Sequence, residues 1–233
     1  MKRLMIVSLT AALVVALTST AALAVVGSIK NTKHDLSSGN TTYAIKGTED
    51  EVCVFCHTPH NATKKVPLWN HTVTNATFTT YASATIDGTT NLGTAADDPV
   101  SVSRLCLSCH DGSVALGAVV KNYSGNSTIG AVAGKTDASG KLISAAALGT
   151  DLSNDHPVGI TYVTGAGTDL RAVTGTKVVH RTNATKFCQL FGAGPTYTVE
   201  CASCHAVHGG TDAEPFLRFS NANSELCLTC HDK

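Results

Sequence analysis

The sequence predicts a mostly irregular chain with short helices and a few short strands, and two observations lead to this fold class. Only 5% of its 233 residues are aromatic, and Gly, Ala, Ser and Thr dominate the middle of the chain. Few large apolar side chains are therefore left to build a conventional core. The chain also contains nine Cys residues, and their grouping indicates a second source of buried surface.

The N-terminus has the features of an export signal. A basic start at Lys2 and Arg3 precedes an apolar run over residues 4–17, and a small-x-small site follows at residues 22–24. The run is too short for a membrane anchor and ends at a cleavage site, so residues 1–24 are predicted to be a signal peptide. We expect one mature domain over residues 25–233, with no membrane span after cleavage. It is expected to be secreted to the cell surface or extracellular space, or into the periplasm.

Eight of the nine Cys residues form four Cys-x-x-Cys pairs, each followed at once by His. This is the attachment motif of c-type haem, in which two sulfurs bind the porphyrin edge and the His binds the iron. A zinc site has no need of a His after each pair, and a redox dithiol motif would occur once. The four are motif 1 (Cys53, Cys56, His57), motif 2 (Cys106, Cys109, His110), motif 3 (Cys201, Cys204, His205) and motif 4 (Cys227, Cys230, His231).

Four haem c groups would then form much of the core, and the chain without haem is not expected to fold. We expect a short helical turn at each motif and coil elsewhere. A weak alternation of apolar and polar residues between Gly159 and His180 also predicts a short hairpin around Gly165-Ala166-Gly167. The ninth Cys, Cys188, has no partner motif. We expect a buried, inert thiol there, and an intermolecular disulfide or a reactive surface thiol are the alternatives.

Six His residues remain as candidates for the second axial position of each iron. This surplus favours haems with both faces filled, which transfer electrons, over a catalytic haem with an open face. His60 and His208 each follow a motif His by three residues and so lie on the same side of that haem. They could bind only the iron of a neighbouring haem or of another subunit, and otherwise they are propionate partners or surface residues.

The other four His residues have different settings. His156 precedes a proline, which holds it in extended backbone, and His34 lies near the mature N-terminus, so both can present an imidazole. His71 and His180 are expected to be exposed or to contact haem propionates.

Several short sequences occur in one order along the mature chain and carry a family resemblance. They are His34-Asp-Leu, Cys53-x-x-Cys-His-Thr-Pro-His60, Pro67-Leu-Trp-Asn, Cys106-Leu-Ser-Cys-His-Asp, Asp155-His-Pro-Val-Gly, Cys201-Ala-Ser-Cys-His-x-x-His208 and Leu226-Cys-Leu-Thr-Cys-His231. The chain resembles multihaem cytochromes with doubled Cys-x-x-Cys-His motifs, most of all the OmcE-type tetrahaem subunits of extracellular cytochrome filaments.

The resemblance implies haems with two His ligands, stacked along a filament, and at least one ligand that crosses between subunits. It implies His34, His60, His156 and His208 as the distal ligands, with His60 or His34 as the donor to another subunit.

The resulting hypothesis is electron transfer by a polymerising haem subunit that is not an enzyme. A monomeric periplasmic or surface electron shuttle is the alternative, and a haem reductase with an open iron is a third hypothesis. Expected partners are identical subunits and redox proteins or extracellular acceptors. Nucleic acid is not an expected partner, because 17 Lys+Arg balance 17 Asp+Glu.

Overall fold

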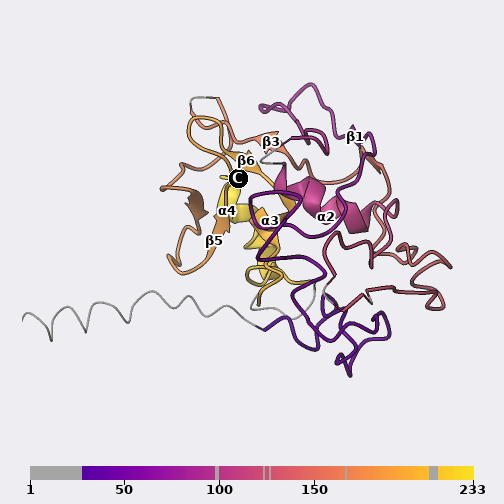
Figure 1. The fold of residues 1–233 in the computed structure, drawn as a ribbon. Coiled ribbons are helices and arrows are strands. Elements are labelled where there is room, and N and C mark those ends of the chain that lie inside the picture. Colours follow the sequence, from indigo (N-terminus) through magenta and orange to yellow (C-terminus); the bar gives the residue numbers. More distant parts are fainter. Residues whose placement is uncertain (1–27, 98–99, 123, 126, 166, 210–214) are drawn as a thin grey trace, which may run out of the picture.

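The structure, a computed structural model, describes residues 28–233 except 98–99, 123, 126, 166 and 210–214. The predicted signal peptide lies outside the described residues. Turns and coil make up most of the described chain, with three short α-helices and six short strands among them (Figure 1). The predicted fold class is confirmed. Within these residues, no helix is both long enough and apolar enough to cross a membrane.

The helices coincide with the haem attachment motifs. They are α2 (Val102–His110), α3 (Cys201–Cys204) and α4 (Cys227–Cys230), with one 3₁₀ turn, η1 (Ala222–Ser224). Motif 1 forms a single turn, in which the His57 N–H donates to the Cys53 carbonyl at 2.8 Å. One helical turn places both sulfurs of a Cys-x-x-Cys pair on the same side of the backbone. The expected helical turn at each motif is therefore present.

The strands form three separate two-stranded sheets. Strand β1 (Thr79–Thr80) is parallel to β2 (Asp151–Leu152), whereas β3 (Ile160–Thr161) with β6 (Thr198–Val199) and β4 (Lys177–Val179) with β5 (Phe187–Gln189) are antiparallel. Isolated two-stranded pairs are marginal by themselves. These strands fasten distant loops to one another and do not form a layer.

The prediction of a hairpin around Gly165-Ala166-Gly167 is wrong. Strand β3 pairs with the distant β6, and the real hairpin is formed by β4 and β5. Tyr162, Val178 and Val199 are buried in one apolar cluster, and Ile160 packs against it. The alternating sequence pattern identified segments that are partly buried. The pairing of their strands depends on how this apolar cluster packs.

Among the described residues, five small apolar clusters take the place of a single core, and the second cysteine of each motif packs against one of them. Cys56 and Cys109 pack against the cluster around Phe55 and Leu116. Cys204 and Cys230 pack against the cluster of Cys188, Phe219 and Leu226. The apolar surface thus gathers where a porphyrin attached to these sulfurs would add to it.

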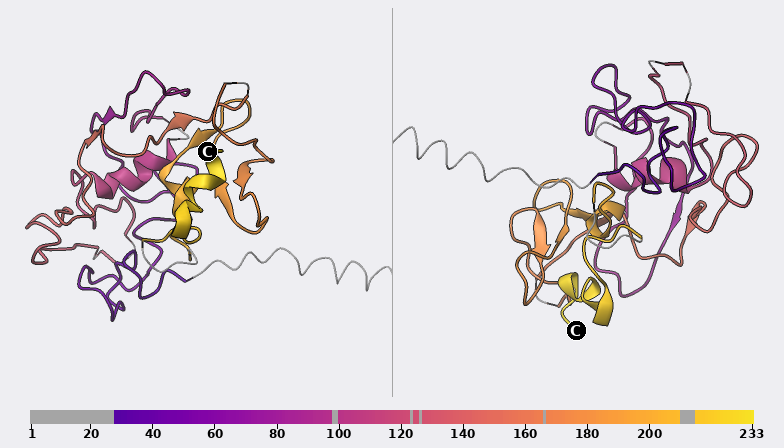
Figure 2. Two further views of the ribbon diagram at one scale, coloured as in Figure 1. Left: turned by 180° about the vertical axis from the view of Figure 1, so that it is seen from behind. Right: turned by 90° about the horizontal axis from the view of Figure 1, so that it is seen from below.

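A buried carboxylate joins α2 to α3, although motifs 2 and 3 are far apart in sequence. The Oε2 atom of Glu200 accepts hydrogen bonds from Ser101 Oγ at 2.9 Å, from Ser103 N at 3.0 Å and from Ser103 Oγ at 2.5 Å. Ser103 Oγ in turn accepts from the N–H of Cys201 at 3.0 Å. The two helices therefore start side by side in the middle of the molecule, between its N-terminal and C-terminal parts (Figure 2).

Candidate haem-binding site

Three of the four motif His residues have a second His facing them. The ring centres are 6.0 Å apart for His57 and His208, 6.1 Å for His34 and His110, and 6.4 Å for His156 and His231. In each pair, one ring follows a Cys-x-x-Cys sequence and the other belongs to the predicted distal set.

These separations fit two imidazoles on opposite faces of one metal. A metal–nitrogen bond is about 2 Å, and the ring centre lies about 1 Å beyond the nitrogen, so two coaxial ligands have ring centres about 6 Å apart. Other aromatic contacts in the chain have similar separations, such as 6.2 Å between His57 and Trp69. The argument for ligation therefore rests on distance together with the motif position of one ring in every pair.

The backbone fixes the orientation of the motif imidazoles. The Nδ1–H groups of His57, His110 and His205 each donate at 2.8 Å, and that of His156 donates at 3.0 Å to the carbonyl of Pro157. The first three acceptors are the carbonyls of Pro67, Ala146 and Pro215. An Nδ1–H held by a carbonyl leaves Nε2 with its lone pair available to a metal.

The surroundings of three His residues in these pairs favour the neutral imidazole, which is the form that binds a metal. Burial, followed by the neighbouring His110, His205 and His208, lowers the pKa of His34 to about 4. Burial and then His57 lower the pKa of His208, and burial lowers the pKa of His231. At neutral pH these rings are therefore not protonated and need no deprotonation before they bind iron.

The structure does not bring His60 and His205 together, nor does it pair either with another imidazole among the described residues. His60 is exposed, and the His205 ring donates through Nδ1 to the carbonyl of Pro215. Of the two candidates for a donor to another subunit, His34 already faces His110. His60 alone among the four predicted distal residues is left without a motif His.

The remaining two His residues lie outside the four predicted sites. His71 is fully buried, contrary to the expected exposure, and its two nitrogens contact the carbonyls of Thr72 at 2.9 Å and Ala115 at 3.0 Å. His180 lies edge-on to Phe219, with ring centres 6.1 Å apart. Burial lowers the pKa of His71 and favours the neutral ring, which carries one N–H and can therefore donate to only one of these carbonyls.

The attachment cysteines form contacts that run from motif to motif. Cys56 and Cys109 pack against the same cluster, and Cys106 and Cys201 lie close to each other. Porphyrins attached at these sulfurs would therefore lie close along one edge, from motif 1 to motif 2 and from motif 2 to motif 3.

The ninth cysteine makes the corresponding connection between motifs 3 and 4. Cys188 is 1% exposed, and its thiol hydrogen-bonds to Cys204 and Cys230. All nine Cys residues are free thiols in the structure.

Within the part of the chain that the structure describes, three buried side-chain polar atoms have no protein partner, and they test whether the residues fit haem. They are Trp69 Nε1, Arg171 Nε and His34 Nδ1. Trp69 lies against His57, and the backbone of Arg171 is bonded to Cys230 at 2.9 Å, so both donors are next to a motif. A buried donor without an acceptor is costly, and haem propionates are acceptors of the kind these positions lack. The residues present fit the group.

The comparison with known families points to the same chemistry. Residues 194–233, which contain motifs 3 and 4, match the family model of the doubled CXXCH motif. The motifs indicate covalently bound haem c. The match supports a multihaem c-type cytochrome that transfers electrons. No curated protein of similar sequence was found.

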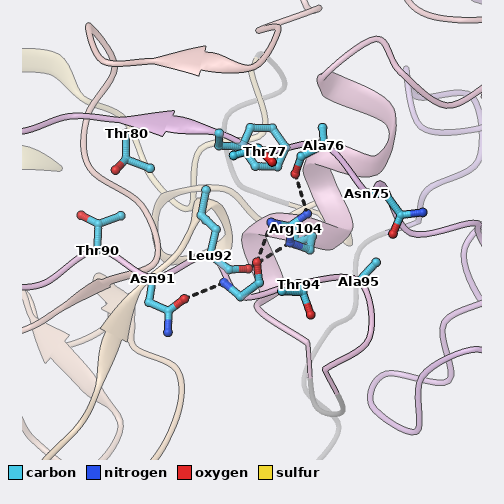
Figure 3. A pocket seen from close by; sticks show the side chains of 12 residues that line it. Asn75, Ala76, Thr77, Thr80, Thr90, Asn91, Leu92, Thr94, Ala95 and Arg104 are labelled. Atoms are coloured by element: carbon cyan, nitrogen blue, oxygen red, sulfur yellow. Dashed lines mark hydrogen bonds between the residues drawn. The ribbon is translucent and has the colours of Figure 1, made fainter.

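A pocket of about 340 Å³ lies apart from this chemistry, between residues 75–80, residues 90–95 and α2 (Figure 3). Its one charged lining residue is Arg104, whose guanidinium donates to the carbonyls of Thr74, Ala76, Leu92 and Gly93. His, Cys, Asp and Glu are missing from its lining residues. With its donors engaged by the backbone, Arg104 holds these loops together.

Sequence reasoning missed residues that support the site from outside the motifs. Glu200 was found only from its contacts, although its position directly before motif 3 could have drawn attention to it. Trp69 lies in a sequence that contributed to the family resemblance, but its role beside His57 was not foreseen. Arg171 carries no local signal, because its link to motif 4 is made by the folded chain.

Proposed function

We propose that the chain carries four haem c groups, each with two axial His ligands, and passes electrons between them as the polymerising subunit of an extracellular filament. We number the haems 1 to 4 in the order of their motifs. The proposed ligand pairs are His57 with His208 for haem 1, His110 with His34 for haem 2, His205 with His60 of a second copy for haem 3, and His231 with His156 for haem 4.

One observation carries this proposal above all. Three motif His residues face a second imidazole within the chain, whereas His205 and the exposed His60 face none among the described residues. A monomeric shuttle would satisfy all four irons internally. A head-to-tail polymer requires one iron that lacks a second ligand and one His that lacks an iron in the same chain, and His205 and His60 provide these two positions.

The protein's part in electron transfer is to hold the haems and close their irons. Bound haem supplies a one-electron couple whose potential depends on axial ligands, hydrogen bonds and burial. The Cys residues fix each porphyrin edge, and the carbonyls of Pro67, Ala146 and Pro215 orient three of the proximal rings. Distal imidazoles keep water and substrates away from the irons.

A reductase is the second candidate, and a specific observation favours it. If His205 stays without a partner in the working protein, the iron of haem 3 has an open face, which is the requirement for a catalytic haem. Assembly through His60 would remove that open face. The two functions therefore differ in the state of one iron.

Substitution of His60 tests the proposal in the secreted, haem-loaded chain. We expect wild-type filaments in electron micrographs, with all four haems low-spin by electron paramagnetic resonance. His60→Ala should give single particles in which one haem in four is high-spin. His180→Ala is the matched control, because His180 is outside the proposed ligand set, and it should assemble like the wild type.

Two results would overturn the proposal. Wild-type single particles with four low-spin haems would establish the monomeric shuttle. Wild-type single particles with one high-spin haem that is reoxidised by nitrite or a sulfur oxyanion would establish the reductase.

A further inference from the structure

The loops that follow motifs 1 and 3 begin and end in the same way at their described residues. In each, the Nδ1–H of the motif His donates at 2.8 Å to the carbonyl of a proline ten residues later, Pro67 for His57 and Pro215 for His205. The next residue has a positive φ in both loops, 63° at Leu68 and 65° at Phe216. A positive φ is rare in bulky residues, so its occurrence at matching positions marks the ends of the two loops as equivalent.

The backbone hydrogen bonds of the two loops match as well. The residue after the motif His donates to the carbonyl of the positive-φ residue, at 3.0 Å in the first loop and 2.7 Å in the second. Two residues beyond it, Asn70 donates to Cys56 at 2.9 Å and Arg218 donates to Cys204 at 2.8 Å. Sequence identity between the loops is low, so the folded backbone shows this repeat more clearly than the sequence does.

The equivalence extends to the rest of the chain and divides it into two units. Each unit has a lone His, then a motif with an additional His three residues later, then a second motif followed by Asp. The lone His faces the second motif of its own unit in both cases, His34 with His110 and His156 with His231. Unit one spans residues 34–111 and unit two spans residues 156–232.

Besides the Glu200 hydrogen bonds to α2, unit two contacts unit one through three groups at the motifs. The His208 ring faces His57. Phe216 lies edge-on to His34, with ring centres 4.7 Å apart. The third contact is the close approach of the first cysteines of motifs 2 and 3, Cys106 and Cys201. Together these define the internal junction.

The counterparts of these junction groups, elsewhere in the two units, are exposed to solvent. Leu68, the counterpart of Phe216, is 47% exposed, and its neighbour Val66 is 65% exposed. The counterparts of Cys201 and Cys106 are Cys53 and Cys227, and these are the two exposed cysteines. His60, the counterpart of His208, is exposed as well.

We propose that copies of this chain join by repeating the internal junction between units, so that unit one of one copy docks on unit two of the next. This rests on the proposed function, because it takes haems to be present at the motifs. Leu68 of one copy then packs against His156 of the other, as Phe216 packs against His34 within the chain. His60 reaches the iron held by His205, and Cys53 lies next to Cys227.

The direction of docking follows from these correspondences. In each contact, a group of one unit reaches the unit that precedes it. The interface therefore joins two different surfaces, and copies can be added in a row without forming a closed ring. Haem 1 would not cover the Leu68 loop. This loop accepts the hydrogen bond from His57 Nδ1, whereas Nε2 is the nitrogen left for iron. A second copy is therefore the occupant that the internal junction specifies.

Leu68→Asp in the secreted, haem-loaded chain tests the docking surface. We expect it to lower filament formation at least tenfold by electron microscopy and sedimentation, leaving single particles with three low-spin haems and one high-spin haem. Ile143→Asp is the matched control, since Ile143 is 56% exposed but lies outside both units' docking groups. It should assemble normally. Leu68→Phe, which copies Phe216, should also assemble.

The failure of this inference differs from the failure of the proposed function. Normal Leu68→Asp filaments with four low-spin haems would overturn the repeated junction and leave the filament function standing. Wild-type chains that never assemble would overturn the function itself. If Leu68→Asp yields no haem-loaded protein, Val66→Asp tests the same surface, with normal assembly again contradicting the inference.

Discussion

Cys188 is the cysteine that the attachment motifs leave over, and its surroundings make it inert. Hydrogen bonds to Cys204 and Cys230, together with burial, raise the pKa of its thiol far above the ordinary range. The thiolate, which is the reactive form, is therefore not populated at neutral pH. This setting favours the buried thiol expected from the sequence over a reactive surface thiol.

We predict that Cys188 in the haem-loaded protein resists alkylation at pH 8 and becomes alkylated once the chain is unfolded. Mass spectrometry of peptides would follow this modification, and the eight attached cysteines would stay unmodified in both states as thioethers. Rapid alkylation of the native protein would instead support the reactive surface thiol.

At the scale of residues, the sequence predicts candidate ligands where a local pattern indicates them, and it says nothing of positions that only the folded chain creates. The Cys-x-x-Cys-His spacing names the attachment residues, and the proline after His156 indicates a presented imidazole. His71 was misjudged, because its burial and its carbonyl partner Ala115 come from a distant segment. For the same reason, nothing local indicates the position of Arg171 beside motif 4.

At the scale of elements, the connection between α2 and α3 depends on one buried carboxylate. Glu200 accepts from Ser101 and Ser103 at the start of α2, while it directly precedes α3. This places motif 2 against motif 3 and so sets the internal junction between the two units.

We predict that Glu200→Ala destabilises the haem-loaded protein by about 2–4 kcal/mol, because it leaves several buried donors without an acceptor. Guanidinium unfolding followed by the haem absorbance would measure the change. Glu51→Ala, at an exposed carboxylate, is the control and should change stability by less than about 0.5 kcal/mol. Equal midpoints for the two variants would show that the Glu200 contacts do not hold the helices.

The elements themselves were only partly predictable. Short helical turns at the motifs follow from the chemistry of haem attachment, and the structure has them. Strand pairing did not follow, because β3 and β6 are joined by burial of Tyr162, Val178 and Val199, which alternation along one segment cannot reveal. Two-residue strands carry too little periodicity to specify a partner.

At the scale of the whole molecule, small clusters replace a continuous core, so the haems should supply much of the buried surface. Phe55 and Leu116 belong to one such cluster, and Cys188 and Phe219 to another. Each has attachment cysteines at its edge. A cofactor that completes the core makes its binding free energy part of the folding free energy.

We predict that residues 25–233 produced without haem attachment do not fold. Circular dichroism should show a largely unordered chain, and limited proteolysis should degrade it much faster than the haem-loaded protein. A protease-resistant chain without haem would mean that the five apolar clusters suffice by themselves.

The central claim is that four bis-His haems run through each chain and that the third is completed by a neighbour. A cryo-electron microscopy map of filaments sheared from secreting cells tests it most directly. The account predicts an iron between each of the pairs His57–His208, His34–His110 and His156–His231, and an iron between His205 and His60 of the adjacent copy. A map in which His205 has its second ligand within its own chain, or in which any of the three pairs is split between irons, would contradict it.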